Sequence, residues 1–409
     1  MLYQNLQERG FIAQCSNEAG LSELLEQGRV TGYIGYDPTA TSLHVGHLLP
    51  IICLIHVQRA GHIPLVLVGG GTGLVGDPSG RTEMRDFLTA EKLEENVKAI
   101  KTQLSRFLDL SPGKGLMLNN ADWLRPLHYL DFLRDIGRHF SVNRMLAAES
   151  VKSRLERGMS FIEFNYSLLQ AYDFMYLAQH HDCRLQLGGN DQWGNIVAGA
   201  DLSRRMLGKE VFGLTLPLLT TAGGAKMGKT AGGAVWLDAR RTSVYDFYQF
   251  WINTADEDVI RFLKLFTFLS LEEIETFAHL RGADLREPKQ ILAWQVCALV
   301  HGREAADAAQ AAAAAAFGGP EGGDPDAVPS TKILRSRLRE GIPAFILLHE
   351  TGLSSSSSEA RRLISQGGAY VGERKITSFD QLIGLDQADR TGTIWLRAGK
   401  KKHHRVLPA

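Results

Sequence analysis

Two histidines three residues apart are the first side chains whose type and spacing could do chemistry. His44-Val-Gly46-His47 follows a stretch that reads as a strand (30–36) and a turn, and a helix over 48–60 begins there. Unsatisfied backbone N–H groups and the helix dipole favour anions at a helix start, where imidazoles can donate to phosphate oxygens. Gly46 has no side chain, so a flat base could lie against the backbone. The alternative is ordinary packing of two histidines at a helix start.

A second candidate is the glycine-rich segment 223–230, GGAKMGKT, which carries two lysines. It matches the phosphate-binding pattern GxxxxGK[ST], but that pattern must open a helix, and further glycines follow here. We therefore interpret it as a lysine-bearing loop, with a P-loop as the alternative. Residues 71–76 match GxGxxG after a strand, yet Asp77 and Pro78 follow at once and oppose the helix that a dinucleotide site needs. A dehydrogenase is the weaker reading.

The sequence gives little support for a metal site or for secretion of the protein. The i,i+3 histidines lack an HExxH context and a third ligand nearby, so we predict no metal site. The four cysteines form no CxxC pair, which argues against a zinc ribbon or a disulfide framework and for a reducing compartment. The N-terminus reaches Glu8 and Arg9 before any apolar stretch, and the longest apolar run (48–57) is too short for the ~20 residues of a membrane helix. The sequence predicts a cytoplasmic protein without a membrane partner.

The elements that must position these residues read as an α/β fold. A strand at 30–36, a helix at 48–60 and a strand at 63–68 form a βαβ unit of a parallel sheet. Helical patterns follow at 89–108, 127–158 and 163–179, and a short strand at 183–187 ends in two glycines.

Composition divides the rest of the chain. Between residue 226 and the linker we expect no strands and a helical segment from 244 to 301. Residues 318–330, GGPEGGDPDAVPS, have the composition of that linker. Residues 331–409 contain 14 basic and 7 acidic residues, a net +7 in a chain whose total formal charge is zero. We expect two helices, at 342–352 and 358–366, and β-like stretches at 369–371 and 393–396. The predicted domains are 1–222, 223–317 and 331–409, joined by the linker 318–330.

Five segments in this order resemble the bacterial tyrosyl-tRNA synthetase family of class I aminoacyl-tRNA synthetases. They are YIGYDPTATSLHVGH (33–47), NYSLLQAYD (165–173), LGGNDQWGN (187–195), KMGKT (226–230) and SEARRLISQGGAYV (358–371). The last is similar to an S-four-type RNA-binding domain. The resemblance covers essentially the whole chain and implies a Rossmann-like catalytic domain, a helical anticodon-side domain and a small C-terminal α+β RNA-binding domain.

The reaction of this family needs positioning and charge stabilisation, because the substrate carboxylate itself attacks the α-phosphate of ATP. The resemblance implies ATP as a substrate that brings Mg²⁺ with it, and no permanent cofactor. It assigns catalysis to Thr39, His44, His47, Lys226, Lys229 and Thr230. It assigns ATP binding to Gly35, Asp37, Gly46, Gly189, Asp191 and Met227.

Recognition of tyrosine rests on a pocket that offers its phenol both a donor and an acceptor, since phenylalanine would leave both groups unpaired. The handling of phenylalanine by this enzyme class is an established example of such rejection. By resemblance Tyr33 and Asp173 hold the hydroxyl, and the other tyrosine-binding residues are Asp77, Tyr166, Gln170, Gln186 and Gln192. The spacing of Tyr166, Gln170 and Asp173 independently places all three on one helix face.

The basic C-terminal segment fits an RNA partner, with Arg361, Arg362, Arg374 and Lys375 as candidate phosphate contacts. The resemblance implies tRNA(Tyr), L-tyrosine and ATP as binding partners, and a homodimer with the apolar stretch 132–145 as its candidate surface. Two other functions stay open: tryptophanyl-tRNA synthetase, whose indole substrate only donates, and a non-catalytic RNA-binding protein on the same scaffold.

Overall fold

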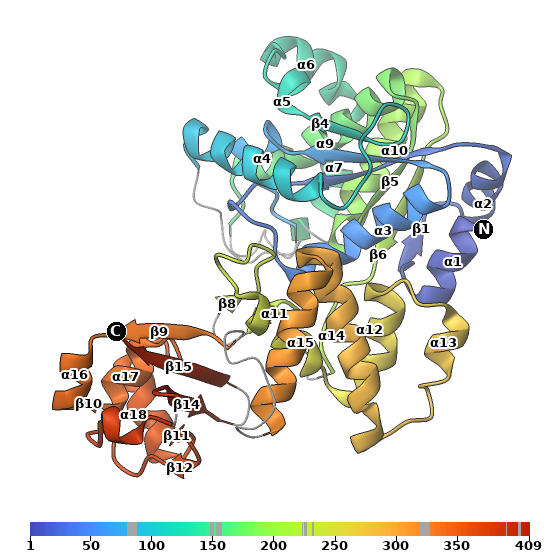
Figure 1. The fold of residues 1–409 in the computed structure, drawn as a ribbon. Helices are drawn as coiled ribbons and strands as arrows, with labels where there is room; N and C mark the ends of the chain where they lie inside the picture. Colours follow the sequence, from blue (N-terminus) through green and yellow to red (C-terminus); the bar gives the residue numbers. More distant parts are fainter. Residues whose placement is uncertain are drawn as a thin grey trace. The chain divides into compact units, whose positions relative to one another are not determined.

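The computed structural model describes two compact units. It covers residues 1–79, 88–147, 151–152, 158–222, 224, 227–230, 233–318, 328–389, 391–399 and 402–409, with only the backbone of Lys229, Thr230 and 316–318. Unit 1 comprises Met1–Lys229, Trp236–Asp238 and Ala255–Arg281, and unit 2 comprises Thr230–Val235, Ala239–Thr254 and Gly282–Ala409. Figure 1 follows the chain from blue to red. Among the described residues, no helix combines the length and the hydropathy needed to cross a membrane.

Unit 1 is built on a six-stranded sheet in the order β1-β6-β5-β2-β3-β4. All neighbouring strands are parallel except β1, which pairs antiparallel with β6. The strands are β1 (Gln14–Cys15), β2 (Thr31–Tyr36), β3 (Ile63–Val68), β4 (Leu116–Asn119), β5 (Cys183–Gly189) and β6 (Phe212–Leu216). In β3, IPLVLV, every residue after the first is buried, as expected for a strand covered on both faces.

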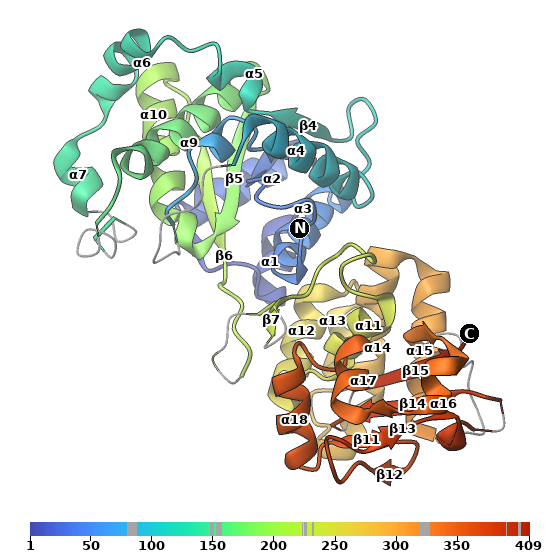
Figure 2. The same cartoon turned by 90° about the vertical axis from the view of Figure 1, so that its left-hand side faces the viewer.

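Helices cover both faces of this sheet. In Figure 2, α3 (Leu48–Arg59) and α4 (Ala90–Leu104) lie on one side, and α9 (Phe161–His180) and α10 (Trp193–Leu207) lie on the other. Helix α9 begins at a capping box in which Ser160 and Glu163 satisfy each other's backbone N–H groups. The remaining helices of unit 1 are α1 (Leu2–Arg9), α2 (Glu18–Gln27), α5 (Ala121–Leu124), α6 (Tyr129–Asp135), α7 (Val142–Ala147), α12 (Val259–Phe266) and α13 (Leu271–Glu275).

The order of the parallel strands has one reversal, between β2 and β5. From β2 the chain moves through β3 to β4 on one side, and from β5 to β6 on the other. This is the doubly wound Rossmann arrangement, in which ligands bind beyond the carboxyl ends of the strands at the reversal. The sheet therefore places the segments after β2 and β5 at its natural binding position, which confirms the predicted α/β class.

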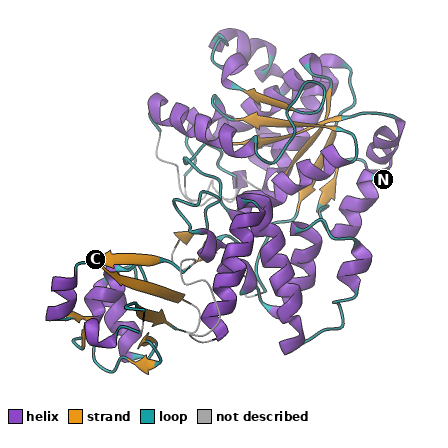
Figure 3. Cartoon of the chain, viewed as in Figure 1, coloured by secondary structure: helices purple, strands orange, loops and turns teal. Residues whose placement is uncertain are grey.

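Unit 2 contains helices and a second sheet. Helices α11 (Val244–Ile252), α14 (Arg286–His301) and α15 (Arg303–Gly318) pack against one another. The sheet, coloured orange in Figure 3 like the other strands, has the order β12-β11-β14-β15-β9. Its strands are β9 (Ser330–Ile333), β11 (Ala369–Val371), β12 (Arg374–Lys375), β14 (Ile394–Ala398) and β15 (Lys402–Pro408); β10 (Ile342–Pro343) pairs with β13 (Leu382–Ile383).

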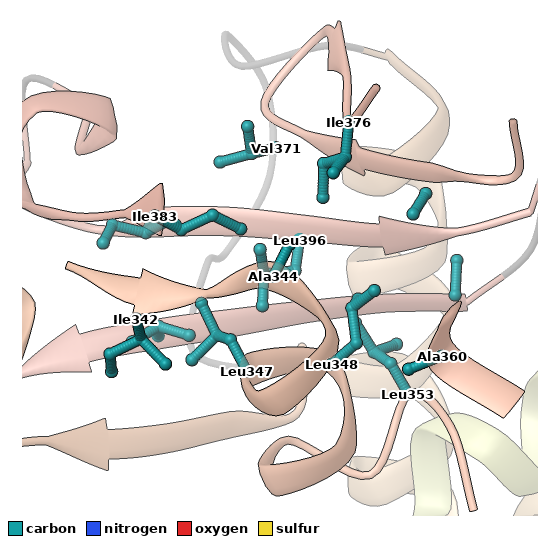
Figure 4. Close-up of a cluster of buried hydrophobic side chains, with 14 of the residues drawn as sticks. Ile342, Ala344, Leu347, Leu348, Leu353, Ala360, Val371, Ile376, Ile383 and Leu396 are labelled. Atoms are coloured by element: carbon teal, nitrogen blue, oxygen red, sulfur yellow. The ribbon is translucent and has the colours of Figure 1, made fainter. Parts of the chain in front are cut away.

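Three helices pack on the C-terminal sheet and form its core: α16 (Arg335–Glu340), α17 (Ala344–Glu350) and α18 (Ser357–Ser365). Figure 4 shows Leu347 and Leu348 of α17 close to Ile342, Leu396 and Ala360. A serine run precedes α18 and caps it, because Ser356 accepts a hydrogen bond from the Glu359 N–H. This separate core confirms the predicted small α+β fold at the C-terminus.

Two sequence-based expectations differ from the structure. The continuous helix expected over 127–158 is interrupted, with α6, a 3-10 turn at Gly137–His139 and α7 in its place among the described residues. Short strands follow residue 226, namely β7 (Lys229–Thr230) and β8 (Gly233–Ala234). The strand at 229–230 also rules out a P-loop, whose helix would begin there. Most of the predicted linker, 319–327, lies outside the described residues.

Candidate active site

A cavity of about 730 Å³ opens at the carboxyl ends of the parallel strands of unit 1. Segments that follow β2, β3, β4, β5 and β6 all line it, together with the inner face of α9. The lining contains these residues predicted from sequence: Tyr33, Gly35, Asp37, Thr39, His44, Gly46, His47, Asp77, Tyr166, Gln170, Asp173, Gln186, Gly189, Asp191, Gln192 and Met227. Lys226 lies outside the described residues, and the side chains of Lys229 and Thr230 are not described.

Asp173 forms a buried acceptor in this cavity. Its Oδ1 accepts a hydrogen bond from the Trp123 indole N–H at 2.7 Å, and its Oδ2 accepts one from Asn120 Nδ2 at 2.9 Å. Burial raises the pKa of Asp173 to about 7, against the lowering effect of those two donors. Each oxygen retains acceptor capacity after one hydrogen bond, so the carboxylate can also accept from a ligand.

Tyr33 brings a hydroxyl into the same cavity from β2. Its side chain is 1% exposed, and Oη has no hydrogen-bond partner among the described residues. Burial, and then the charge of Asp173, raises its pKa well above the usual value, so the phenol stays protonated. A buried hydroxyl without a partner costs free energy, which a ligand oxygen would recover. Tyr33 and Asp173 together offer one donor and one acceptor.

A chain of hydrogen bonds through Asn120 and Thr72 connects Asp173 to Asp37. Neither residue was identified from the sequence. Asn120 Nδ2 donates to Thr72 Oγ1 at 3.0 Å as well as to Asp173. Thr72 Oγ1 in turn donates to Asp37 Oδ1 at 3.0 Å, and Asp37 Oδ2 accepts from Tyr166 Oη at 3.3 Å. Only their positions in the sequence could have indicated them, because Thr72 follows the end of β3 and Asn120 follows the end of β4.

A second polar chain surrounds Asp77. Gln192 Nε2 donates to Asp77 Oδ2 at 2.7 Å, and Asn195 Nδ2 donates to Gln192 Oε1 at 3.2 Å and to Gln170 Oε1 at 3.1 Å. Burial, and then the charge of Asp37, raises the pKa of Asp77 to about 6. Asp77 is therefore mostly ionised at neutral pH and suited to a cationic group.

His44 and His47 present a defined pair of donors. His44 Nδ1 accepts from the Gly46 N–H at 3.0 Å, and His47 Nδ1 accepts from the His44 N–H at 3.1 Å. In the neutral rings the proton is then on Nε2, which makes Nε2 a donor on both side chains. The ring centres are 4.0 Å apart. Each ring can therefore donate through Nε2, and the phosphate contact expected from the HVGH spacing stays a prediction.

The segment that carries the lysines lies against this histidine turn. Gly228 has a positive φ of 86°, and a Cβ there would lie 3.1 Å from the backbone nitrogen of Gly46. The neighbouring Met227 is buried, and its N–H donates to the Leu219 carbonyl at 2.9 Å. The backbone between the two lysine positions, at Met227 and Gly228, therefore lies beside the histidine turn.

The mouth and the remaining wall are polar. Gln186 is buried, and its Oε1 has no partner among the described residues. Thr39 and Asp191 are exposed at the rim, and Asp191 Oδ1 would lie 2.5 Å from a Cβ at position 189, so the Asp191 side chain would have to move if position 189 were not glycine. Asp37 and Asp191 follow β2 and β5, the two strands at the reversal of the sheet.

In unit 2, the four candidate RNA-binding residues are exposed. Arg361 and Arg362 lie on α18, and Arg374 and Lys375 form β12. The Arg361 guanidinium carbon lies 4.0 Å from the centre of the Phe345 ring. This stacking fixes the cation at the surface of the C-terminal domain.

Comparisons with known proteins agree with this arrangement. Residues 25–318 match the family model of the class I tRNA synthetases (W and Y). The chain thus belongs to the class I tRNA synthetases, on a Rossmann sheet with the cavity at its reversal.

The curated relatives narrow the assignment. A tyrosine–tRNA ligase of Desulfosudis oleivorans is 54% identical over 98% of each chain, and one of Agrobacterium fabrum is 51% identical over 99% of this chain and 98% of its own. Within the class, the chain belongs to the tyrosine–tRNA ligase family.

Solved structures give the same fold. A C-terminally truncated mitochondrial tyrosyl-tRNA synthetase of Aspergillus nidulans superposes with a TM-score of 0.68 at 33% identity, over 76% of this chain and 92% of its own. The tyrosyl-tRNA synthetase of Archaeoglobus fulgidus, complexed with L-tyrosine, gives 0.58 at 19% identity, over 76% of this chain and 100% of its own. The second likeness supports the fold alone.

Proposed function

We propose that the chain activates L-tyrosine with ATP and transfers it to tRNA(Tyr). In the first step a carboxylate oxygen of tyrosine attacks the α-phosphate, and pyrophosphate leaves. In the second, a ribose hydroxyl of the terminal adenosine of the tRNA attacks the carbonyl carbon of the adenylate, and AMP leaves. No covalent enzyme intermediate is needed, so the residues of the cavity act by position and charge.

The observation that carries the proposal is the buried pair of Tyr33 and Asp173. A phenolic hydroxyl between them accepts from Tyr33 Oη and donates to the Asp173 carboxylate, which is already oriented by Asn120 and Trp123. A phenylalanine ring would leave both groups unpaired in a buried site, at a cost of about 1–3 kcal/mol for each. An indole N–H has no acceptor for the Tyr33 hydroxyl, which favours tyrosine over tryptophan.

The rest of the cavity accounts for the other parts of the substrates. Asp77, Tyr166 and Gln170 surround the α-ammonium group, where the anionic Asp77 offsets its charge. Gln186 and Gln192 flank the amino acid. The carboxylate is thereby directed toward the strand ends, where the α-phosphate of ATP lies.

The ATP end of the cavity supplies donors and space. Gly35, Gly46 and Gly189 allow the nucleotide to approach the backbone, Asp191 accepts from the ribose hydroxyls, and Asp37 and Met227 lie beside it. Thr39 and the Nε2–H groups of His44 and His47 face the phosphates. Removal of one preorganised donor of this kind typically costs on the order of a hundredfold in rate.

The lysine segment and Mg²⁺ both offset the negative charge of the ATP phosphates. We place Lys226, Lys229 and Thr230 on the pyrophosphate, because the backbone of Gly228 lies on Gly46. Among the described residues no group of three or more histidines, cysteines or carboxylates could hold a metal ion. Mg²⁺ commonly binds through substrate phosphates, so we infer that it enters with ATP and offsets phosphate charge.

The C-terminal domain is the proposed contact for tRNA, through Arg361, Arg362, Arg374 and Lys375. A second copy of the chain is the proposed partner of α6, α7 and the start of α9, where apolar side chains are exposed. These are Tyr129, Leu130, Leu133, Val142, Leu146, Phe161 and Ile162. All four cysteines are free, which suits a reducing compartment, and we place the enzyme in the cytoplasm.

Exchange of labelled pyrophosphate into ATP, with each amino acid in turn, tests the function. Tyrosine alone should support exchange. Exchange with tryptophan instead would identify a tryptophanyl enzyme, and no exchange with any amino acid would favour an RNA-binding protein on this scaffold.

A further inference from the structure

A second cavity, of about 930 Å³, lies in unit 1 at the amino ends of β2 and β3, away from the proposed active site. Helices α1 and α3, which contact each other, form its walls together with the segment after α12. Its lining includes Arg9, Arg29 and Arg59, with Glu26 as an acidic side chain. The volume lies within the range typical of small-molecule sites.

The three arginines give this cavity uncompensated positive charge. Among the described residues, none of them forms an ion pair with a carboxylate. Arg9 donates to the carbonyls of Lys264, Thr267 and Leu269, which hold it in place without neutralising it. Arg9 is buried, whereas Arg29 and Arg59 are exposed, so an anion in the cavity would offset chiefly the buried charge of Arg9.

A hydrogen-bond chain fixes the proton of His56 on the nitrogen that lacks a partner. Arg9 Nε donates to Asn5 Oδ1 at 3.0 Å, which sets the orientation of the Asn5 amide. Asn5 Nδ2 is then the donor to His56 Nδ1, at 3.3 Å. His56 therefore carries its proton on Nε2, which is buried and has no acceptor among the described residues.

His56 is also neutral at physiological pH. The side chain is 5% exposed, and burial, followed by the charges of Arg9 and Arg59, lowers its pKa to about 4. Its Nε2–H is thus a permanent donor in the wall of a positively charged cavity. An unmade hydrogen bond of this kind is expensive, and a ligand oxygen would satisfy it.

Arg59 and His62 add further donors around the same space. The Arg59 guanidinium carbon lies 3.7 Å from the centre of the Phe268 ring, so the group is oriented, and it donates to no acceptor among the described residues. His62 Nδ1 accepts from the Val30 N–H at 3.2 Å, which leaves its Nε2 as a donor in the neutral ring. Arg29 Nε donates to the Gly61 carbonyl at 3.0 Å.

From these donors we propose that the second cavity binds a small phosphate-bearing molecule. Donors from several directions suit the three terminal oxygens of a phosphate better than the two of a carboxylate. His56 lines the cavity and is only 5% exposed, so the site suits a small free molecule and not the bulky backbone of an RNA chain. The proposal does not depend on the reaction at the strand ends.

Titration with inorganic phosphate, followed by isothermal calorimetry, tests this site. L-tyrosine and a non-hydrolysable ATP analogue are present throughout to occupy the first cavity. Arg59→Gln removes one exposed cation and should weaken phosphate binding roughly tenfold to a hundredfold, the effect of one charge-assisted hydrogen bond. Arg59→Lys should restore part of the affinity. Arg106→Gln, on the exposed surface outside both cavities, is the matched control and should bind like the wild type.

Two further experiments test where the anion binds and whether it is a free small molecule or part of tRNA. A crystal soaked in tungstate should show an anomalous peak within hydrogen-bond distance of His56 Nε2. Phosphate binding should persist when tRNA is present in excess. Equal affinities in wild type and Arg59→Gln, no peak beside His56, or displacement of phosphate by tRNA would each overturn the proposal.

Discussion

The Trp123 indole N–H donates to Asp173 Oδ1 at 2.7 Å, inside the cavity that Asp173 shares with Tyr33. The bond joins the short helix after β4 to the middle of α9, so the proposed acceptor for the substrate hydroxyl is held by two distant parts of the chain. The Tyr33 hydroxyl, in contrast, has no partner among the described residues. The two groups therefore respond differently to substitution.

Tyr33→Phe removes only an unpartnered hydroxyl, so the fold should be unaffected. The value of kcat/KM for tyrosine in pyrophosphate exchange should fall about threefold to tenfold, the effect of one hydrogen bond, while the small activity with phenylalanine stays constant. Tyr36→Phe is the matched control, because Tyr36 Oη is also buried, lacks a partner in the described part of the chain and lies in the same wall. An unchanged tyrosine-to-phenylalanine ratio in Tyr33→Phe would remove Tyr33 from hydroxyl recognition.

The pH dependence of tyrosine binding should follow Asp173. Its pKa is raised to about 7, so the carboxylate is ionised above that pH and becomes protonated as the pH falls through it. Because the ionised form is the better acceptor, the KM for tyrosine should rise as the pH falls from 8 to 6. Asp173→Asn cannot titrate and should flatten the profile near pH 7, at a lower overall activity. A wild-type KM that is constant over this range contradicts the assignment.

The same raised pKa affects stability. Asp173 binds its proton more tightly in the folded than in the unfolded protein, so its contribution to the free energy of unfolding is largest at low pH and is lost as the pH rises through about 7. Asp77, whose pKa is raised to about 6, acts in the same direction. At neutral pH the two buried carboxylates therefore lower the free energy of unfolding, and the same ionised groups are available to bind a ligand.

Gly46→Ala tests the position of the His44 ring. The new Cβ would lie 2.8 Å from His44 Cε1, so the ring must shift. A displacement of about 1 Å in a positioning group can cost on the order of a hundredfold, and we expect that loss in the kcat of adenylate formation with little change in the KM for tyrosine. Gly194→Ala, where a Cβ meets nothing within 4 Å, should be neutral. Equal kcat values in the two variants would show that His44 does not face the phosphates.

Arg374→Gln should weaken tRNA binding at low salt and reduce the slope of log K against log[salt] by roughly 0.7–0.9, the value for one phosphate contact. Pyrophosphate exchange should be unchanged, because Arg374 is not among the residues that line the cavity of unit 1. Lys98→Gln, on the exposed face of α4, is the control. A salt slope identical to that of the wild type would exclude Arg374 from the tRNA contact.

Leu130→Asp places a charge on the exposed apolar surface of α6, where Leu130 is 77% exposed. If a second copy covers this surface, the variant should sediment as a monomer while the wild type sediments as a dimer. A wild-type chain that is monomeric at micromolar concentration, or a dimer that tolerates the charge, would contradict the proposed surface.

The sequence predicted those parts of the site that depend on local spacing. The i,i+4 and i,i+3 intervals of Tyr166, Gln170 and Asp173 put all three in the cavity, because α9 is one uninterrupted helix. HVGH likewise predicted a helix start. Asn120 and Thr72 were not predictable in this way, since their hydrogen bonds to Asp173 and Asp37 join residues 35 or more positions apart, and only the sheet order brings them together.

Elements whose pattern was locally ambiguous were predicted less well. Residues 127–158 have helical composition, but a turn at Gly137–His139 interrupts them in the described structure. The charged C-terminal end reads as a basic tail, yet β15 lies between β14 and β9 and buries His404, Arg405 and Val406. Tertiary pairing, which composition does not record, decides such segments.

A crystal structure of the chain with L-tyrosine bound tests the central claim most directly. The account predicts that the phenolic oxygen lies within hydrogen-bond distance of both Tyr33 Oη and the Asp173 carboxylate, with Asn120 and Trp123 still bonded to Asp173. A tyrosine ring bound elsewhere in the cavity, or a phenolic oxygen in contact with neither residue, would contradict it.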